Sequence, residues 1–137
     1  MERLFEITDH IIIRSKPENV FEAITKADLL SKWCPQSAIS NPKKGGSLIF
    51  YWPNGTIIET AFDLFIHGKC VSFQFGPEYV SIHLTERDNS VLVNVAHSKI
   101  KTIQNLDSIV HIAQSWTFLL FNLKVFIELG LDFRKDH

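Results

Sequence analysis

The stretch SIVHIAQSWTFLLFNLKVFIEL, residues 108–129, decides the fold of this 137-residue chain. At about 100° per residue, eight of its apolar side chains share an arc of roughly 120° on a helical wheel, which predicts one long helix with a wide core face. These are Ile109, Ile112, Ala113, Trp116, Leu119, Leu120, Leu123 and Ile127. Gly130 follows directly and predicts the end of the helix, because glycine readily adopts the left-handed conformation found at helix C-termini.

A second apolar stripe lies opposite the first on the same predicted helix. Its members fall within roughly 80° of one another on the wheel. They are Phe118, Phe121, Val125 and Leu129. Two interpretations are open: a curved sheet and its loops could bury both stripes, or the second stripe could be an exposed patch used for dimerisation or for a partner.

The same stretch is too polar for a membrane span, which needs about 20 residues with almost no polar groups. The polar residues that interrupt it are His111, Gln114, Asn122, Lys124 and Glu128. The first six residues, MERLFE, also lack the apolar core of a signal peptide. We therefore expect a cytoplasmic protein without a membrane span.

Before the helix, apolar residues alternate with a period of two, as in Leu48, Phe50 and Trp52. Turn-forming residues separate these runs at roughly ten-residue spacing, which predicts an antiparallel meander. The turns are expected at residues 53–55, 67–68, 76–77 and 87–90. Each strand has one apolar and one mixed face, so the sheet should be covered on one side only, and the long helix is its natural cover.

The chain opens with a predicted strand over residues 4–14, on which Asp9 is the only charge in the apolar phase. Ser15 is a candidate helix cap, and Pro17 suits the first turn of the short helix that should follow. A second short helix is expected near residues 28–33. The loop of residues 41–46 then leads into the meander.

Composition indicates one globular domain over residues 1–137, with 45% hydrophobic and 21% charged residues. Eleven Phe and three Trp stand against two Tyr, so either the core is rich in large residues or an internal hollow is lined with rings. The net charge is -1 and no basic run exceeds Lys43–Lys44, which argues against nucleic-acid binding. Cys34 and Cys70 have neither metal-ligand nor redox spacing and are expected to be free, buried thiols.

The order of elements is typical of an α+β helix-grip fold, in which a curved antiparallel sheet of six to seven strands wraps a long C-terminal helix. Residues 20–25 and 29–33 resemble the opening helices of the SRPBCC (START-like) superfamily, in particular the branch named after the C-terminal domain of the activator of the heat-shock-protein-90 ATPase. Gly45–Gly46 before an aromatic strand, the strand end at residues 93–98 and the pattern of residues 115–130 match as well. Cys34 departs from this pattern, because a second tryptophan is common at that position.

This resemblance implies a deep pocket between sheet and helix, which members use to hold lipids, sterols or polyketide-like molecules, sometimes for catalysis. In the chaperone-activator branch a related domain contacts a protein instead. We expect ten residues on the covered faces to line the cavity. They are Trp33, Trp52, Phe62, Phe73, Ile82, Val95, His97, Trp116, Leu120 and Leu123.

His97 is the titratable residue of most interest, because it shares the inward phase of Val91, Val93 and Val95. It could bind the polar end of a ligand, act as an acid or base, or simply be a satisfied histidine at the end of a strand. Asp9 could be a polar anchor in the pocket or a strand irregularity. The tryptophans could equally be plain core residues.

No catalytic constellation, metal site or cofactor is predicted. His67, His83 and His97 lack the spacing of metal ligands, and Cys34 is better explained as a structural thiol than as a nucleophile. The leading hypothesis is a non-enzymatic domain that holds a lipid-like or aromatic small molecule.

Two alternatives are open. One is a protein-interaction module with a filled core, either a homodimer or a chaperone partner. The other is a cyclase- or hydrolase-like enzyme that uses His97. Cavity volume separates the small-molecule hypothesis from the interaction module, because a filled core leaves no room for a ligand. The enzyme requires a second polar group within hydrogen-bond reach of His97.

Overall fold

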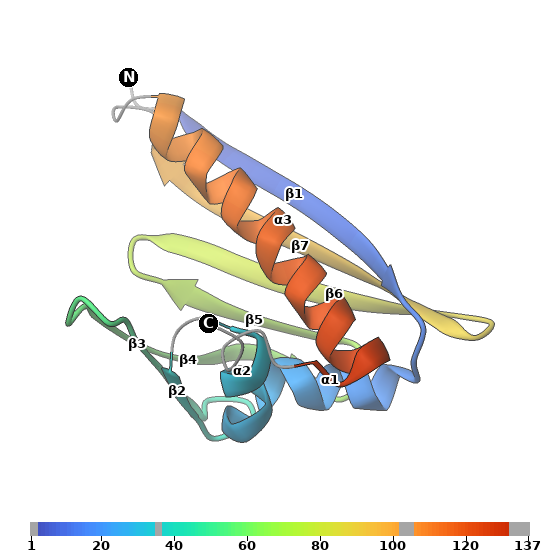
Figure 1. Ribbon diagram of the computed structural model, residues 1–137. Helices are drawn as coiled ribbons and strands as arrows, with labels where there is room; N and C mark the ends of the chain where they lie inside the picture. The colour runs from blue at the N-terminus through green and yellow to red at the C-terminus, as the bar shows by residue number, and fades with distance from the viewer. Residues whose placement is uncertain (1–2, 35–36, 102–105, 132–137) are drawn as a thin grey trace.

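One strand, two short helices, six strands and one long helix follow each other in the computed structural model, which describes residues 3–34, 37–101 and 106–131 (Figure 1). The elements are β1 (Leu4–Ile13), α1 (Pro17–Thr25), α2 (Ala27–Trp33), β2 (Ser37–Ser40), β3 (Ser47–Tyr51), β4 (Ile57–Ile66), β5 (Cys70–Phe75), β6 (Glu78–Arg87), β7 (Ser90–Lys101) and α3 (Leu106–Leu129).

The strands form a seven-stranded sheet in the order β1-β7-β6-β5-β4-β3-β2, and every neighbouring pair is antiparallel. Strands β2 to β7 follow one another as a meander because short turns join them. The first strand completes the sheet at the far edge, where Ile13 pairs with Val91 and Leu4 pairs with Lys101. The predicted α+β helix-grip fold is confirmed.

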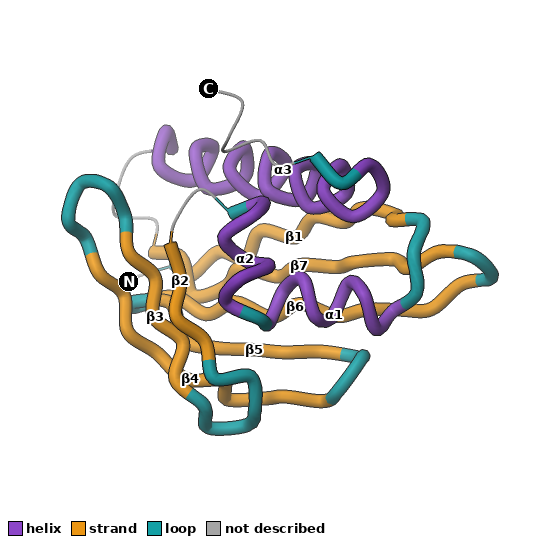
Figure 2. Tube along the Cα trace, turned by 60° about the horizontal axis from the view of Figure 1, so that its bottom comes forward, coloured by secondary structure: helices purple, strands orange, loops and turns teal. Residues whose placement is uncertain are grey.

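All three helices lie on the same face of the sheet. Figure 2 shows α3 running along the β1 side, with α1 and α2 next to it. The core fills the space between helices and sheet, and its most deeply buried large side chains include Phe21, Phe62 and Leu123. Along the predicted core stripe of α3, Leu120 and Leu123 are buried and the other members are partly buried.

Of the two helix ends predicted from single residues, the end of α3 agrees with the structure and the start of α1 does not. Gly130 has a φ of 69° and its N–H donates to the Phe126 carbonyl at 2.8 Å, so it ends α3 as predicted. The prediction that Ser15 caps α1 is wrong. The N-cap is Lys16, which makes no side-chain capping bond, and Pro17 takes the first turn because its fixed φ suits a helix start.

Among the described helices, Ser108–Leu129 is long and apolar enough to cross a membrane by length and composition. One such helix is weak evidence for a membrane protein, because a helix that packs on a sheet needs an apolar face as well. Here Leu120 and Leu123 pack in the core, and Lys124 donates to Glu128 and to the Ile12 carbonyl of β1. Packing on the sheet therefore accounts for part of its apolar surface.

Candidate functional site

A cavity of about 80 Å³ lies between the helices and strands β3, β5 and β6. Five of the ten predicted lining residues line it, namely Trp33, Trp52, Phe73, Ile82 and Trp116. Four others, Phe62, Val95, Leu120 and Leu123, are buried in the core outside its wall. The tenth, His97, lies beyond the wall in a polar network.

Sequence reasoning missed several lining residues, although a signal was present for most of them. Phe50 and Phe75 share the strand phases of Trp52 and Phe73, and Leu119 belongs to the core stripe of α3. Cys34 also lines the cavity, whereas the sequence predicts only that it is a buried thiol. Period-two and helical patterns could therefore have found Phe50, Phe75 and Leu119.

The cavity is small because aromatic rings occupy the space between helix and sheet. The Phe50 ring lies 5.8 to 6.1 Å from the rings of Trp52, Phe73 and Phe75, measured between centroids. Ligand pockets usually measure about 300–1,000 Å³, so the protein's own rings leave no room for a lipid-sized molecule.

Two of the indole N–H groups at the cavity are bound by the protein itself. Trp33 donates to the Ala23 carbonyl at 2.8 Å, which ties α2 to α1. Trp116 donates to His97 Nδ1, also at 2.8 Å, which ties α3 to β7. These two indoles therefore contribute structure, and neither N–H points at an empty position.

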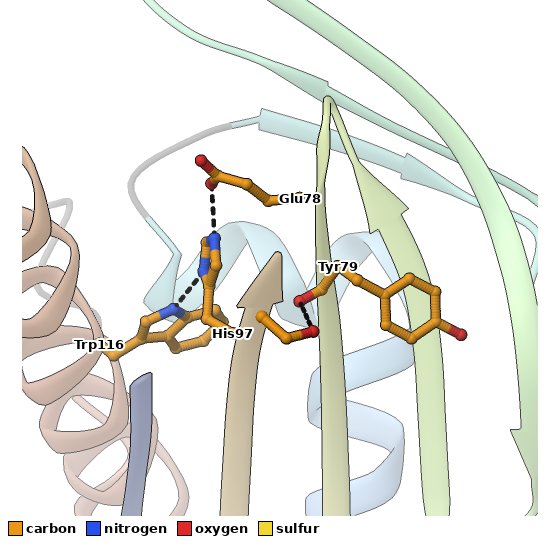
Figure 3. A network of polar contacts seen from close by, with 5 residues as sticks. Glu78, Tyr79, His97 and Trp116 are labelled. Carbon is orange, nitrogen blue, oxygen red and sulfur yellow. Dashed lines mark hydrogen bonds and ion pairs between the residues drawn. The ribbon is translucent and has the colours of Figure 1, made fainter. Parts of the chain in front are cut away.

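Glu78, His97 and Trp116 form a chain of hydrogen bonds beside the cavity (Figure 3). Because an indole N–H can only donate, His97 Nδ1 must accept, and the ring proton resides on Nε2. That nitrogen lies 2.7 Å from Glu78 Oε1 and donates to it. His97 is 4% exposed, with both ring nitrogens engaged. It has the geometry of a satisfied core histidine.

Glu78 is the second polar group that the enzyme alternative required, and the sequence did not point to it. It begins β6 directly after a turn and reaches His97 across the β6–β7 pairing, where Val80 lies opposite His97. Acid–base chemistry needs a ring nitrogen that faces a substrate. Trp116 occupies the one nitrogen that Glu78 leaves free, so this geometry does not favour catalysis.

A β-bulge adjoins His97 on β7. The pairing with β1 shifts between Phe5 and Ile7, and Lys99 adopts a φ of 61°. The bulge turns Lys99 outward, where its ammonium lies 5.3 Å from the centre of the Tyr79 ring on the uncovered face of the sheet. On that face the Tyr79 hydroxyl donates to Asp63 at 2.6 Å, and this hydrogen bond raises the pKa of Tyr79.

The other candidate polar residues lie away from the cavity. Asp9 accepts a hydrogen bond from the Thr117 hydroxyl at 2.8 Å and so fastens β1 to α3. His67 and His83 are exposed. Within the described ranges, no group of three or more His, Cys, Asp or Glu is arranged to hold a metal ion. Cys34 and Cys70 are free and buried.

A wider depression is formed by the connections β1–α1, β4–β5 and β6–β7. It is open to solvent and carries charges of both signs. They belong to Arg14, Lys16, Glu18, Glu86, Arg87 and Asp88. This balance gives the depression no preference for an anionic or a cationic ligand.

The second stripe of α3 is exposed. Phe118 is 57%, Phe121 54% and Leu129 67% exposed, so the interpretation in which the sheet buries both stripes is wrong for these three. Val125 is partly buried, and Val110 extends the stripe with 48% exposure. A shallow hollow on this face is lined by Ala113, Gln114, Thr117, Phe118 and Phe121. We call Val110, Phe118, Phe121, Val125 and Leu129 the outer stripe.

Comparison with protein families matches residues 14–128 to the activator of Hsp90 ATPase homolog 1-like proteins. Comparison with curated proteins found no match.

Among solved structures, the protein SSP2350 from Staphylococcus saprophyticus has a TM-score of 0.84 at 18% identity, over 95% of this chain and 96% of that one. The Aha1 dimer from Colwellia psychrerythraea, solved in solution, has a TM-score of 0.80 at 24% identity, over 92% of this chain and 98% of that one. At such identities the structural likeness establishes the fold alone.

Proposed function

This chain belongs to the family of activator of Hsp90 ATPase homolog 1-like proteins, and from that premise we propose that it is a protein-interaction domain that pairs with a second copy of itself through the outer stripe of α3. Family and fold fit a binding or interaction domain. The choice of a second copy as the partner is the proposal.

Exposure of the outer stripe is the observation that carries it. Phe118 and Phe121 lie next to each other on one helix face and each leaves more than half of its surface in water. Large contiguous apolar patches are uncommon on monomeric proteins and mark interaction sites. Aromatic residues at the centre of such a patch are the usual energetic anchors of an interface.

Charge on α3 also favours a neutral, apolar partner. The charged side chains along residues 108–129 are Lys124 and Glu128, which pair with each other at 2.6 Å. Lys124 also donates to the Ile12 carbonyl of β1, and Glu128 accepts from the N–H of Arg14, the residue that follows β1. An uncharged apolar face is best matched by another such face, and a second copy supplies one. The Aha1 dimer of Colwellia psychrerythraea is a protein of this fold that pairs with itself.

Light scattering coupled to size-exclusion chromatography tests the proposal. The wild-type protein should have the mass of a dimer at high micromolar concentration. Phe121→Glu should have the mass of a monomer, because pairing would bury an uncompensated carboxylate. Ile57→Glu is a matched control, since Ile57 is 54% exposed like Phe121 but lies on β4. It should remain dimeric.

Three outcomes contradict the proposal: a wild-type monomer at every concentration, a Phe121→Glu dimer, or a monomer that forms a stoichiometric complex with a chaperone through this face. Circular dichroism should show the same helix content in both variants and in the wild type. This control shows that a variant with a monomeric mass is still folded.

Binding of a small apolar molecule is the second candidate function, and the ring-lined cavity favours it. A ligand larger than about 80 Å³ would require rings such as Phe50 and Phe75 to rotate out of the cavity. Native mass spectrometry of protein purified from its own cell tests this. A stoichiometric adduct that disappears in a Trp52→Ala variant would support ligand binding in the cavity. A mass equal to that of the chain alone would contradict it.

A further inference from the structure

We infer that the two copies pair α3 against α3 in an antiparallel register, around a twofold axis that lies outside the outer stripe, at the level midway between positions 119 and 120. This inference rests on the proposed function and adds the geometry of the interface. It follows from the spacing of the exposed residues along α3, from the hollow on its surface and from the absence of charge on the stripe.

The residues on the outer face of α3 have the same spacing when counted from either end of the helix. Val110, Gln114, Phe118, Phe121, Val125 and Leu129 fall within an arc of about 100° on the helical wheel. Their successive spacings are 4, 4, 3, 4 and 4 residues. When a twofold axis at the midpoint of the stripe relates two antiparallel copies, as in an isologous dimer, this spacing sets every member of the stripe opposite another member.

In that register each residue faces a defined partner. Phe118 lies opposite the second copy's Phe121, Val110 opposite its Leu129, and Gln114 opposite its Val125. The two most exposed rings therefore meet at the axis, where water is excluded most completely. A parallel pairing would instead set each residue against its own equivalent.

The shallow hollow on α3 has the form that antiparallel packing requires. Gln114, Thr117, Phe118 and Phe121 stand at positions i, i+3, i+4 and i+7 and surround it. Four residues with this spacing make the hole into which a side chain of a facing helix inserts. The centre of the hole lies between positions 117 and 118, so the twofold axis places the second copy's Phe121 over it, and the reciprocal contact forms at the same time.

An interface confined to one helix of each copy is expected to be small beside the roughly 1,200–2,000 Å² that stable complexes bury. The dimer should therefore dissociate on dilution. Its stripe spans 19 residue steps, or about 28 Å at 1.5 Å per residue. That length separates the antiparallel register from the parallel one in a cross-linking experiment.

Val110→Cys and Leu129→Cys are prepared as separate variants and oxidised alone or as an equimolar mixture. In the antiparallel register the introduced thiols of either variant alone lie about 28 Å apart, far beyond disulfide range. In the mixture, Cys at position 110 faces Cys at position 129, and up to about half of the chains should form a disulfide-linked dimer. The native Cys34 and Cys70 are buried, and Ile57→Cys serves as the exposed control that should not cross-link with either variant.

Two results would overturn the register. Cross-linking of each variant on its own would indicate a parallel pair. A wild-type dimer that cross-links in neither arrangement, but that Phe121→Glu still converts to a monomer, would indicate a different crossing geometry on the same outer stripe. Both results leave the proposed function standing. A monomeric mass for the wild-type protein would instead remove the proposed function, and the register with it.

Discussion

His97 shows how a buried titratable residue can serve structure. Its two nitrogens join strand β6, through Glu78, to helix α3, through Trp116. If one partner of such a hydrogen bond is removed, the other is left buried and unsatisfied. The free-energy cost of that unsatisfied group exceeds the net contribution of the intact hydrogen bond to stability. The network therefore holds α3 against the sheet near the end of β7.

Trp116→Phe should lower the free energy of unfolding by about 1–2 kcal/mol, because the ring is largely kept while His97 Nδ1 loses its donor. Urea denaturation measures this. In a double-mutant cycle with His97→Phe, the coupling between the two positions should be about 1 kcal/mol. Strictly additive effects would show that the hydrogen bond does not contribute to stability.

Glu128 fixes the other end of α3 to β1. Burial of its carboxyl opposes ionisation, but the hydrogen bonds from Lys124 and from the Arg14 N–H outweigh it and hold the pKa of Glu128 below its ordinary value of 4.5. A carboxyl whose pKa is lower in the folded than in the unfolded chain stabilises the fold when ionised. That contribution is complete above pH 4.5 and is lost as the pH falls through the folded-state pKa.

Glu128→Gln should therefore cost about 1 kcal/mol of unfolding free energy at pH 7, since the pair is partly exposed. The difference from wild type should shrink when urea denaturation is repeated near pH 3.5. Glu86→Gln, at an exposed position on β6, should change stability little at either pH. An equal deficit of Glu128→Gln at both pH values would mean that the mutation acts through packing and not through charge.

At the scale of elements, the loop between β2 and β3 depends on two adjacent glycines with different roles. Gly45 adopts a φ of 76° in open space, whereas a Cβ on Gly46 would lie 1.9 Å from the Asn41 carbonyl oxygen. The same loop bonds to Phe62 of β4 through the Gly45 N–H and the Gly46 carbonyl. The loop therefore has no freedom to move away from the clash.

Gly46→Ala should destabilise the protein by more than about 2 kcal/mol, because backbone atoms must move to admit the methyl group. Gly45→Ala should cost only about 1 kcal/mol, the strain of a non-glycine residue in the left-handed region. Thermal and urea unfolding of the two variants provide the comparison. Equal losses would show that the loop can relax around Gly46.

Elements with a regular apolar period could be predicted from sequence, and those without one could not. The alternation of β3 to β7 and the helical wheel of α3 predict the antiparallel meander and its cover helix, because burial on one face imposes a period. Strand β2, Ser37–Ser40, was missed because four residues with one large apolar side chain carry no period. Ser15 was misplaced as a cap because two positions before Pro17 could serve as the helix start.

Residues of the candidate site could be predicted only where their place follows from the alternation of inward and outward side chains along a strand. Trp52, Phe73 and Ile82 line the cavity because they share the inward phase of their strands. The Glu78–His97 contact depends on the register between two strands, and the cavity volume depends on how rings pack against each other. Both the contact and the cavity volume depend on residues that are far apart in the sequence, so neither could be predicted from local patterns.

At the scale of the whole molecule, α3 has one face in a filled core and another in solvent. Along its inner face the aromatic rings leave about 80 Å³ of free space. Along its outer face Phe118 and Phe121 remain uncovered. The chain thus has little room to bury a ligand, whereas pairing of two copies would remove a large apolar helix face from water. Dimerisation is therefore expected to supply more binding free energy than a ligand in the cavity.

Pairing through α3 predicts a melting temperature that depends on protein concentration, because a partner that binds only the folded chain stabilises it by mass action. A hundredfold increase in concentration supplies about 2.7 kcal/mol per dimer, or about 1.4 kcal/mol per chain, which should raise the midpoint by about 3–5 °C. Calorimetry at roughly 5 and 500 µM measures this. Phe121→Glu should melt at one temperature throughout, since it removes the pairing face and leaves the core intact. A wild-type midpoint that stays constant over this range would show that the outer stripe does not pair, and a shift shared by Phe121→Glu would assign the association to another surface.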